Sequence, residues 1–268
     1  MVKTFIHARD IERWVPKSLS EVIGCSELKL ELAQYLRPNG RGPNILISGD
    51  PGTGKTAAVK AFVRTLSCSK RTTDPLLPCE ECESCRTFDV RYPELGLFAS
   101  LNPRVTVDGA EPLHFCPINC GGVTEAQLRE LLNDLRYFRG LILIYLDEAH
   151  RLKPRNMNHL LLPPIEETEA IWVASSALAH ELDPMLLRRF AIRTKTSLPD
   201  EEELLMFLAH RCNEWKIKVD DIITLQLLSQ RSQGNVSECL SVLARAAANE
   251  SRLLAKELVL RHPFHTFA

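Results

Sequence analysis

Hydrophobic and polar positions along the chain follow two periods, which predict strands and helices in turn. Apolar runs that have the length of strands occupy positions 44–49, 113–118, 141–146 and 170–175. Apolar residues at helical spacing occupy positions 18–36, 55–68 and 124–138. Strands that alternate with helices predict an α/β fold with a parallel β-sheet.

Two parts of the chain depart from this alternation. From Pro199 onward only helical patterns occur, which predicts a small all-helical domain after the α/β part. We therefore expect an α/β domain at 1–198 and a helical domain with a C-terminal tail at 199–268. Between about 67 and 90, prolines, threonines and four cysteines interrupt the pattern, and this interruption predicts an insertion.

Charge does not indicate the function. The chain of 268 residues has 33 Lys and Arg against 34 Asp and Glu, so any DNA contact would need a local basic patch. The polar N-terminus and the lack of an apolar run near the ~18 residues of a membrane helix predict a cytoplasmic protein without membrane contact. The reducing cytosol argues against a disulfide framework despite nine cysteines, and grouped cysteines in such a protein more often bind metal or do redox chemistry.

The sequence GDPGTGKT lies between a predicted strand and a predicted helix and fits the phosphate-loop pattern G-x-x-x-x-G-K-[ST]. Its glycines let backbone N–H groups face an anion, and the helix adds its positive end. Lys55 would reach the β- and γ-phosphates of ATP, and the Thr56 hydroxyl would bind Mg²⁺. The expected nucleotide-binding residues of this loop are Gly49, Asp50, Pro51, Gly52, Thr53, Gly54, Lys55 and Thr56.

A second motif, LILIYLDEAH, is acidic and places Asp147 and Glu148 at the carboxyl end of a buried strand. Ligands of open α/β sheets bind at this edge. Asp147 would orient Mg²⁺, and Glu148 would position the attacking water. A solvated acidic strand end is the alternative. We interpret His150 as structural or as a relay, because His159 is not at a helical ligand spacing from it.

These motifs together resemble AAA+ ATPases, and most specifically the gamma/tau clamp-loader subunits of bacterial DNA polymerase III. RWVPKSLSEVIG (13–24) is similar to the N-terminal box of that family, and NMNHLLLPPIEE (156–167) to its helix before the third strand. The resemblance covers about 13–247. It implies adenine contacts from Val22 and Ile23 and a helical lid at 199–268.

The resemblance also implies two residues that act on the γ-phosphate end. In WVASSALAHELDPMLLRRF, Ser175 or Ser176 falls at sensor 1, and we select Ser176. In the family this residue ends a strand between the phosphate-loop strand and the acidic strand. Arg189 aligns with the arginine that acts on the nucleotide of a neighbouring subunit. Arg188 replaces the serine before it and would share the role.

Three departures from the family pattern change the expectations. Ser237 stands at the position of the sensor 2 arginine, and either Arg231 or Arg245 would have to replace that charge. Pro163–Pro164 should kink the helix or end it early. The family's C-terminal collar has no room in 268 residues, so we expect a short form that is oligomeric at least transiently.

The family carries a zinc module after the phosphate-loop helix, and four cysteines stand at that location. Cys68, Cys79, Cys82 and Cys85 have the spacing C-x10-C-x2-C-x2-C, and four thiolates suffice for a closed tetrahedral zinc site. Ordinary reduced thiols are the alternative. Cys116 and Cys120 have no second pair, so we expect buried free thiols there.

The sequence therefore predicts an ATPase that uses ATP, Mg²⁺ and Zn²⁺. The resemblance implies other AAA+ or clamp-loader subunits as partners, and a sliding clamp and primer-template DNA as further partners. A scaffold subunit that binds nucleotide with little turnover, and an AAA+ ATPase outside replication, remain alternatives. DEAH also occurs in helicases, but these need two motor cores and the chain has room for one. DNA polymerase activity is not expected.

Overall fold

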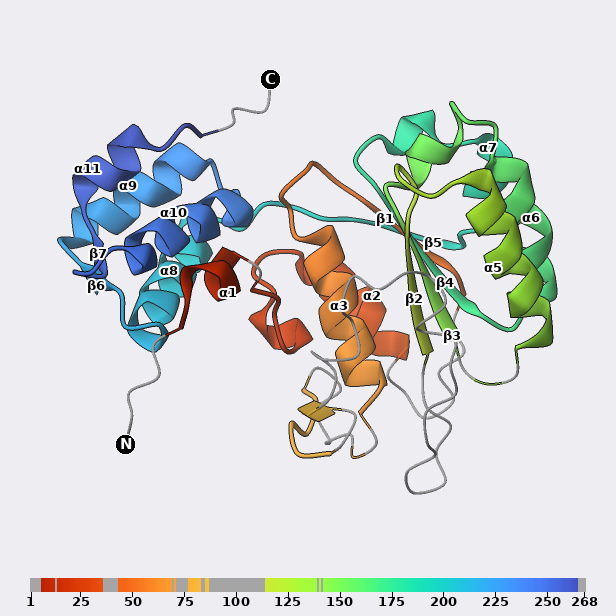
Figure 1. Ribbon diagram of the computed structural model, residues 1–268, viewed down its shortest axis with the longest axis horizontal. Helices are drawn as coiled ribbons and strands as arrows, with labels where there is room; N and C mark the ends of the chain where they lie inside the picture. The colour runs from red at the N-terminus through yellow and green to blue at the C-terminus, as the bar shows by residue number, and fades with distance from the viewer. Residues whose placement is uncertain are drawn as a thin grey trace.

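The computed structural model describes residues 6–12, 14–35, 43–68, 70, 77–82, 85–86, 114–138, 140 and 142–264. Figure 1 shows two bodies: a sheet flanked by helices, and a smaller helical body that contains the C-terminal helices. The chain crosses from the first body to the second between β5 and α8, near the predicted boundary at 198.

One five-stranded parallel sheet forms the centre of the larger body. Its strands have the order β2-β3-β4-β1-β5. The strands are β1 (Ile45–Ser48), β2 (His114–Asn119), β3 (Ile142–Asp147), β4 (Ile171–Ser176) and β5 (Ile192–Lys195). The four predicted strands are confirmed, and β5 is an addition. β4 lies between β1 and β3, so the phosphate-loop strand, the predicted sensor strand and the acidic strand are neighbours.

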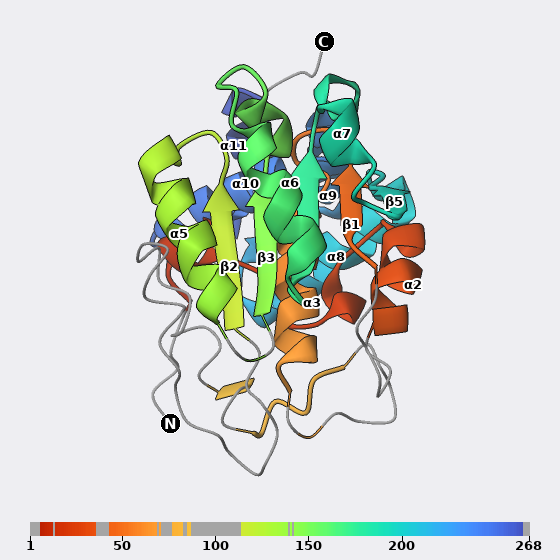
Figure 2. The same ribbon diagram turned by 90° about the vertical axis from the view of Figure 1, so that its right-hand side faces the viewer.

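Helices cover both faces of the sheet, because successive side chains of its buried strands point to opposite faces. In Figure 2, α5 (Glu125–Tyr137) and α6 (Asn158–Glu167) lie in front of the sheet and α3 (Lys55–Leu66) lies behind it. Leu146 and Trp172 pack in the core on the α5 and α6 side. Tyr145 and Val173 pack in the core that contains Phe62 of α3. Shorter elements complete this body: α2 (Ser26–Tyr35), α7 (Pro184–Leu187) and the 3-10 helices Leu19–Glu21, Ala149–Leu152 and Ala179–Glu181.

The predicted early end of the proline-containing helix is wrong. α6 continues through Pro163 and Pro164 to Glu167. Each proline removes one backbone donor, but Leu161 and Ile165 remain buried in the core and hold the helix against the sheet. At its end, the Thr168 N–H and hydroxyl both donate to the Pro164 carbonyl, at 3.1 and 2.6 Å.

The smaller body confirms the helices that the sequence predicts after 199. They are α8 (Glu201–Glu214), α9 (Ile222–Ser232), α10 (Val236–Ala248) and α11 (Lys256–Arg261). It is not strictly all-helical, since β6 (Lys218–Val219) and β7 (Leu253–Leu254) form a short parallel ladder. The N-terminal helix α1 (Ala8–Glu12) also belongs to this body in space, because fully buried Ile11 packs in its core. None of the helices in the described part of the chain is both long enough and apolar enough to cross a membrane.

Candidate functional site

The phosphate loop connects β1 to α3, and its glycines have conformations that other residues rarely adopt. The φ angles are +149° at Gly49, +78° at Gly52 and +82° at Gly54, where Gly54 is the N-cap of α3. A Cβ atom at Gly49 would lie 2.0 Å from the Thr196 hydroxyl oxygen, and one at Gly52 would lie 2.6 Å from Nδ2 of Asn235. The loop therefore needs glycine both for backbone shape and for close packing.

Lys55 begins α3, and its ammonium group closes the loop on itself. Nζ donates to the Gly49 and Asp50 carbonyls, each at 2.8 Å, and the residue is 6% exposed. Burial lowers the pKa of Lys55 from its ordinary 10.5, although the charges of Glu148, Asp147 and Asp50 oppose this shift. A bound phosphate group would have to replace these carbonyls as the acceptor of the hydrogen bonds that Lys55 donates.

The loop is tied to the segment that leads into the helical body. The Thr53 hydroxyl donates to the Asp50 carbonyl at 2.7 Å and lies 2.6 Å from the Thr196 hydroxyl. The Cys25 thiol reaches the carbonyls of Thr53 and Ser197, both at 3.4 Å. A cavity of about 340 Å³ lies beside these groups and is also lined by Asp50 and Leu198. Cys25 and Thr196 were not predicted as site residues from the sequence.

Val22 and Ile23, which are expected to contact the adenine, pack in two different hydrophobic cores. Val22 is buried in the core with Phe62 of α3, whereas Ile23 packs against the core of the helical body. The N-terminal box thus contacts both bodies. That Val22 and Ile23 contact a nucleotide remains a prediction.

Three hydroxyl groups converge on one carboxylate oxygen at the end of β3. Oδ1 of Asp147 lies 2.8 Å from the Ser175 hydroxyl, 2.9 Å from the Tyr145 hydroxyl and 3.3 Å from the Thr56 hydroxyl. The predicted magnesium residues, Thr56 and Asp147, are therefore side by side, and a hydroxyl beside a carboxylate fits the oxygen ligands that Mg²⁺ prefers. Burial and the Asp147 charge raise the pKa of Tyr145, so its phenol is protonated at neutral pH.

Glu148 follows with a left-handed backbone, φ +54°, and lies beside a buried histidine. Its Oε2 is 3.2 Å from Nδ1 of His150 and accepts from the Ala177 N–H at 3.5 Å. Nδ1 of His150 is also 3.0 Å from the Ser176 hydroxyl. The two serines of β4 thus differ: Ser175 contacts Asp147, whereas Ser176 contacts His150. These contacts fit a structural or relay role for His150.

Arg189 follows α7 and forms an ion pair with Glu166 of α6 through its Nη1 atom. Its side chain is 35% exposed, its backbone carbonyl accepts from the Asn44 amide at 3.2 Å, and its Nε is buried without a hydrogen bond. Arg188 beside it is exposed. An arginine at the surface is suited to contact a neighbouring subunit, but its role in trans remains a prediction.

The N-terminus of α10 meets the phosphate loop. Asn235 caps this helix, since its Oδ1 accepts from the N–H groups of Ser237 and Glu238 at 3.0 and 3.3 Å, and its amide lies against Gly52. Ser237 is exposed in the first turn. The two arginines proposed as substitutes are engaged elsewhere: Arg245 donates to Nδ1 of His262 at 3.0 Å, and Arg231 lies 5.3 Å from the Phe264 ring.

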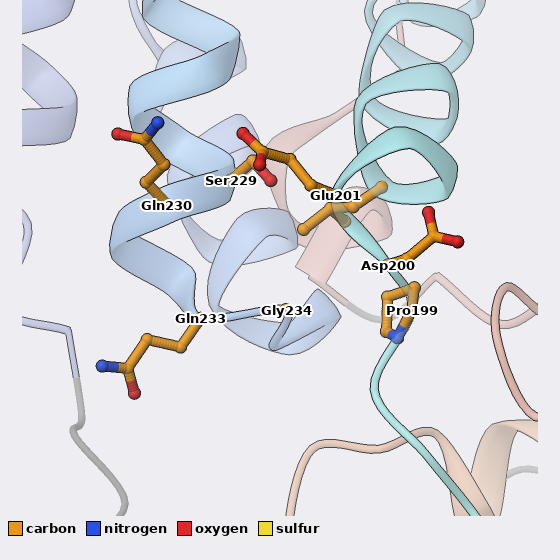
Figure 3. Close-up of a pocket in the computed structure, with 8 residues that line it drawn as sticks. Pro199, Asp200, Glu201, Ser229, Gln230, Gln233 and Gly234 are labelled. Atoms are coloured by element: carbon orange, nitrogen blue, oxygen red, sulfur yellow. The ribbon is translucent and has the colours of Figure 1, made fainter.

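The helical body has a cavity of about 230 Å³ of its own between the start of α8 and the end of α9 (Figure 3). Asp200, Gln230 and Gly234 are among its lining residues. Gly234 lies against the linker, because a Cβ atom there would be 3.1 Å from Cβ of Leu198. The turn before α10 therefore packs on the connection between the two bodies.

The four predicted zinc ligands come together beyond the C-terminal end of α3. Their Sγ atoms all lie within 4.8 Å of one another, near the ~3.8 Å edge of a tetrahedron with zinc–sulfur bonds of about 2.3 Å. Backbone N–H groups of Cys79, Cys82 and Cys85 each donate to the sulfur of the preceding cysteine in the set, at 3.3 to 3.4 Å. Burial raises the pKa of Cys68 and Cys85, so a cation is needed to keep them as thiolates. The donor set fits zinc.

The rest of the predicted insertion, at 69, 71–76, 83–84 and 87–90, lies outside the described residues. Within the described part, the buried cluster at the ligands contains only cysteines. Arg64 of α3 joins the cluster to the helix, since its Nη2 donates to the Cys85 carbonyl at 3.3 Å. Cys116 and Cys120 are fully buried and not disulfide-bonded, which confirms the prediction of free thiols.

The family model described as "ATPase family associated with various cellular activities (AAA)" matches residues 45–198, more than half of the chain. The chain belongs to the AAA family of ATPases. The matched range begins at β1 and ends at the linker before α8, so it contains the phosphate loop, the acidic strand, Ser176 and Arg189.

Curated relatives place this AAA chain near clamp-loader proteins. DNA polymerase III subunit tau/gamma of Haemophilus influenzae is 26% identical over 92% of the chain, and subunit tau of Bacillus subtilis is 22% identical over 90%. The chain spans 33% and 40% of their lengths. Replication factor C small subunit of Methanococcus maripaludis is 39% identical over 21% of the chain. The resemblance found in the sequence is confirmed.

The solved structure titled Thermotoga maritima RuvB Holliday junction branch migration motor shares the AAA fold. It has a TM-score of 0.60 and 18% identity, and the match covers 94% of this chain and 72% of that one. At this identity the likeness supports the fold alone. The confirmed fold is an α/β AAA core with a parallel sheet, followed by helices.

The residues that the sequence analysis missed are those that connect motifs. Tyr145, Cys25 and Asn235 lie outside the phosphate-loop pattern and the acidic pair, yet each contacts one of them. A signal existed only for Tyr145: it is two residues before Asp147, and alternate residues of a strand share a face.

Proposed function

We propose that this protein binds and hydrolyses ATP with Mg²⁺, and that it couples the nucleotide to a movement of its helical lid in the manner of a clamp loader. The observation that carries the proposal is the convergence of Lys55, Thr56, Asp147 and Glu148 at one edge of the sheet. The lid residue Asn235 touches the same loop at Gly52, so a change in the loop acts directly on the lid.

Each predicted residue has a role that fits its position. Lys55 neutralises charge on the β- and γ-phosphates, while Thr56 and Asp147 hold Mg²⁺, which would draw charge from the phosphate oxygens. Glu148 orients the attacking water, and His150 holds the Glu148 carboxylate in place. Ser176 acts as sensor 1 at the end of β4, and Arg189 reaches the nucleotide of a neighbouring subunit.

The cysteine cluster would hold a structural Zn²⁺, because four thiolates leave no open coordination position for chemistry. The chain is thus divided into an AAA core at 1–198, with its zinc module at about 67–90, and a lid at 199–268. Ile6, Ala8, Ile11 and Trp14 pack with the lid, so they would move with it.

The relatives support the biological setting. Similarity to DNA polymerase III tau/gamma and to replication factor C supports assembly with other AAA+ or clamp-loader subunits in the cytoplasm, at least transiently. A sliding clamp, or a similar ring-shaped partner, and primer-template DNA are the proposed targets, in replication or repair.

Steady-state ATP hydrolysis tests the proposed site. Lys55→Ala and Glu148→Gln should each lower turnover about 100-fold or more, because each removes one group that acts at the reacting phosphate. Glu148→Gln should retain nucleotide affinity, since it does not bind the phosphates. Lys256→Ala, at an exposed position in α11, is the control. Unchanged turnover in both site variants would remove the assignment.

Mixing experiments test the role in trans. A Lys55→Ala chain keeps Arg189 but lacks its own activity, whereas an Arg189→Ala chain keeps its own site but lacks the arginine. The mixture should recover activity that neither chain has alone. Absence of any recovery, with assembly shown by light scattering, would remove Arg189 from the mechanism.

A second candidate function is a scaffold subunit that binds nucleotide with little turnover. Exposed Ser237 at the sensor 2 position favours it, because Arg231 and Arg245, the candidate replacements for the missing charge, contact other residues of the lid. Affinity and turnover measured separately discriminate the two functions. Tight ATP binding with negligible hydrolysis, alone and with partner subunits, would favour the scaffold.

An AAA ATPase outside replication is the remaining alternative. A pull-down from the source cell, performed with and without ATP, tests it. Recovery of a sliding clamp or of polymerase subunits supports the clamp-loader proposal, whereas recovery of only repair or mobile-element proteins would favour the alternative.

A further inference from the structure

Tyr145 brings a phenol hydroxyl into the middle of the magnesium residues. Its Oη lies 2.9 Å from Oδ1 of Asp147, 2.9 Å from the Ser175 hydroxyl and 3.1 Å from the Thr56 hydroxyl. The residue is 1% exposed and lies on the face of β3 that packs against α3. Tyr145 thus contacts three polar side chains, and these come from three different elements.

The arrangement of protons explains what this hydroxyl adds. Ionised Asp147 only accepts hydrogen bonds, and the Ser175 hydroxyl already donates to it at 2.8 Å. If Thr56 donates to Tyr145 and Tyr145 donates to Asp147, the lone pairs of Thr56 remain free for a cation. The Thr56 hydroxyl oxygen would coordinate Mg²⁺ through a lone pair and keep its proton. This order of donors is therefore compatible with a bound metal.

The ring and the hydroxyl of Tyr145 have separable roles. The ring is stacked on Phe115 at a centroid distance of 6.4 Å and an interplanar angle of 17°, and it fills the core beside Phe62. A phenylalanine would fill the same space. The hydroxyl serves no packing purpose, and a buried hydroxyl is retained at little cost only where it is hydrogen-bonded.

We propose that the hydroxyl of Tyr145 positions the magnesium residues, holding Thr56 and Asp147 in register beside Ser175 at the end of β4. The proposal rests on the function proposed above. It makes Tyr145 a positioning residue, because it acts on the metal through Thr56 and Asp147.

Binding of fluorescent ADP, measured with Mg²⁺ and again with EDTA, tests the proposal without depending on turnover. Tyr145→Phe should reduce the gain in affinity that Mg²⁺ provides about tenfold or more, as expected for the loss of one hydrogen bond to a charged group. Affinity in EDTA should stay within about twofold of the parent. Thr56→Val, which removes the metal-binding hydroxyl itself, should abolish the Mg²⁺ gain.

Tyr137→Phe is the matched control, because that tyrosine is 76% exposed on α5. Thermal unfolding verifies that Tyr145→Phe is folded, and the Mg²⁺ concentration for half-maximal affinity gives a second measurement on the same protein. An equal loss of affinity with and without Mg²⁺ would show a purely structural role and overturn the proposal, as would an unchanged Mg²⁺ gain.

The two proposals fail in different ways. If the parent protein shows no Mg²⁺-dependent binding of ADP, the proposed function fails and takes this inference with it. If the parent shows that dependence and Tyr145→Phe matches it, only the role of Tyr145 is wrong.

Discussion

Helix α3 has a candidate site at each end, and the two are held together in different ways. At its N-terminus, Lys55 donates to carbonyls of the loop that follows β1, and Thr56 contacts Asp147 at the end of β3. Asp147 in turn accepts from Ser175 of β4, so the sheet fixes the site. Beyond its C-terminus, the described cluster packs only cysteine against cysteine. The nucleotide site is therefore ordered by the fold, whereas the proposed zinc ion would order the cysteine module.

The largest effect is expected when that metal is removed. Chelation of zinc, or Cys82→Ser, should unfold the module, because metal binding and folding are the same event in a segment with little core. Hydrogen exchange at residues 77–82 and 85–86 should lose its protection. ADP affinity should change less than about threefold, since the sheet still holds the phosphate loop.

Cys116→Ser is the control for this prediction, because Cys116 is buried in β2 away from the cluster. A module that keeps its exchange protection after verified zinc removal would show that the protein, not the metal, orders it. If ADP affinity falls when the cysteine module unfolds, the sites at the two ends of α3 are not independent of each other.

The second largest effect concerns the end that the fold orders. Gly52→Ala should lower the free energy of unfolding by about 2 kcal/mol, because a left-handed φ costs an alanine about 1–2 kcal/mol and its Cβ would lie 2.6 Å from the Asn235 side chain. Nucleotide affinity should fall about tenfold or more. Chemical denaturation and ADP binding measure the two quantities.

Gly122→Ala is the matched control, since its nearest neighbour would be 3.6 Å away. Adding Asn235→Gly to Gly52→Ala should recover the part of the loss that is due to the steric contact. If the double variant has the same free energy of unfolding and the same ADP affinity as Gly52→Ala alone, the lid does not press on the loop as the structure indicates.

The sequence predicted the parts of this molecule that a local pattern defines. The phosphate loop, the Asp147–Glu148 pair and the four cysteines predicted to bind zinc each lie in a short segment whose spacing reflects its geometry, and the structure brings each set together. Apolar runs found four of the five strands. β5 is short and alternates exposed and buried residues, so no continuous apolar run marked it.

The parts that were not predicted depend on contacts between distant segments. Cys25 meets Ser197 across 172 positions, and Asn235 meets Gly52 because the lid folds back on the core. The early end expected for α6 was wrong for the same reason, because burial of Leu161 and Ile165 outweighs the loss of two backbone donors. Local propensity does not contain these tertiary contributions.

A smaller effect should follow from breaking the hydrogen bond that Arg64 of α3 donates to the Cys85 carbonyl. Arg64→Met should lower zinc affinity about tenfold, because groups outside the ligand set orient the ligands and tune the metal. Competition with a coloured chelator measures zinc affinity, and Arg129→Met, at an exposed position of α5, is the control. Zinc affinity equal to that of the control would show that the module is independent of the helix.

The smallest effect is a pH dependence at Lys55. Its lowered pKa means that the folded protein loses this proton below pH 10.5, so the folded state gains stability from Lys55 as pH rises through the lowered pKa toward 10.5. Phosphate binding needs the charged form, so ADP affinity should change in the opposite direction and fall over the same interval, by less than about tenfold. Lys55→Arg stays charged and should remove this dependence. If the two proteins show the same affinity profile, another group titrates, and burial of Lys55 does not control how strongly the fold-ordered end of α3 holds a phosphate.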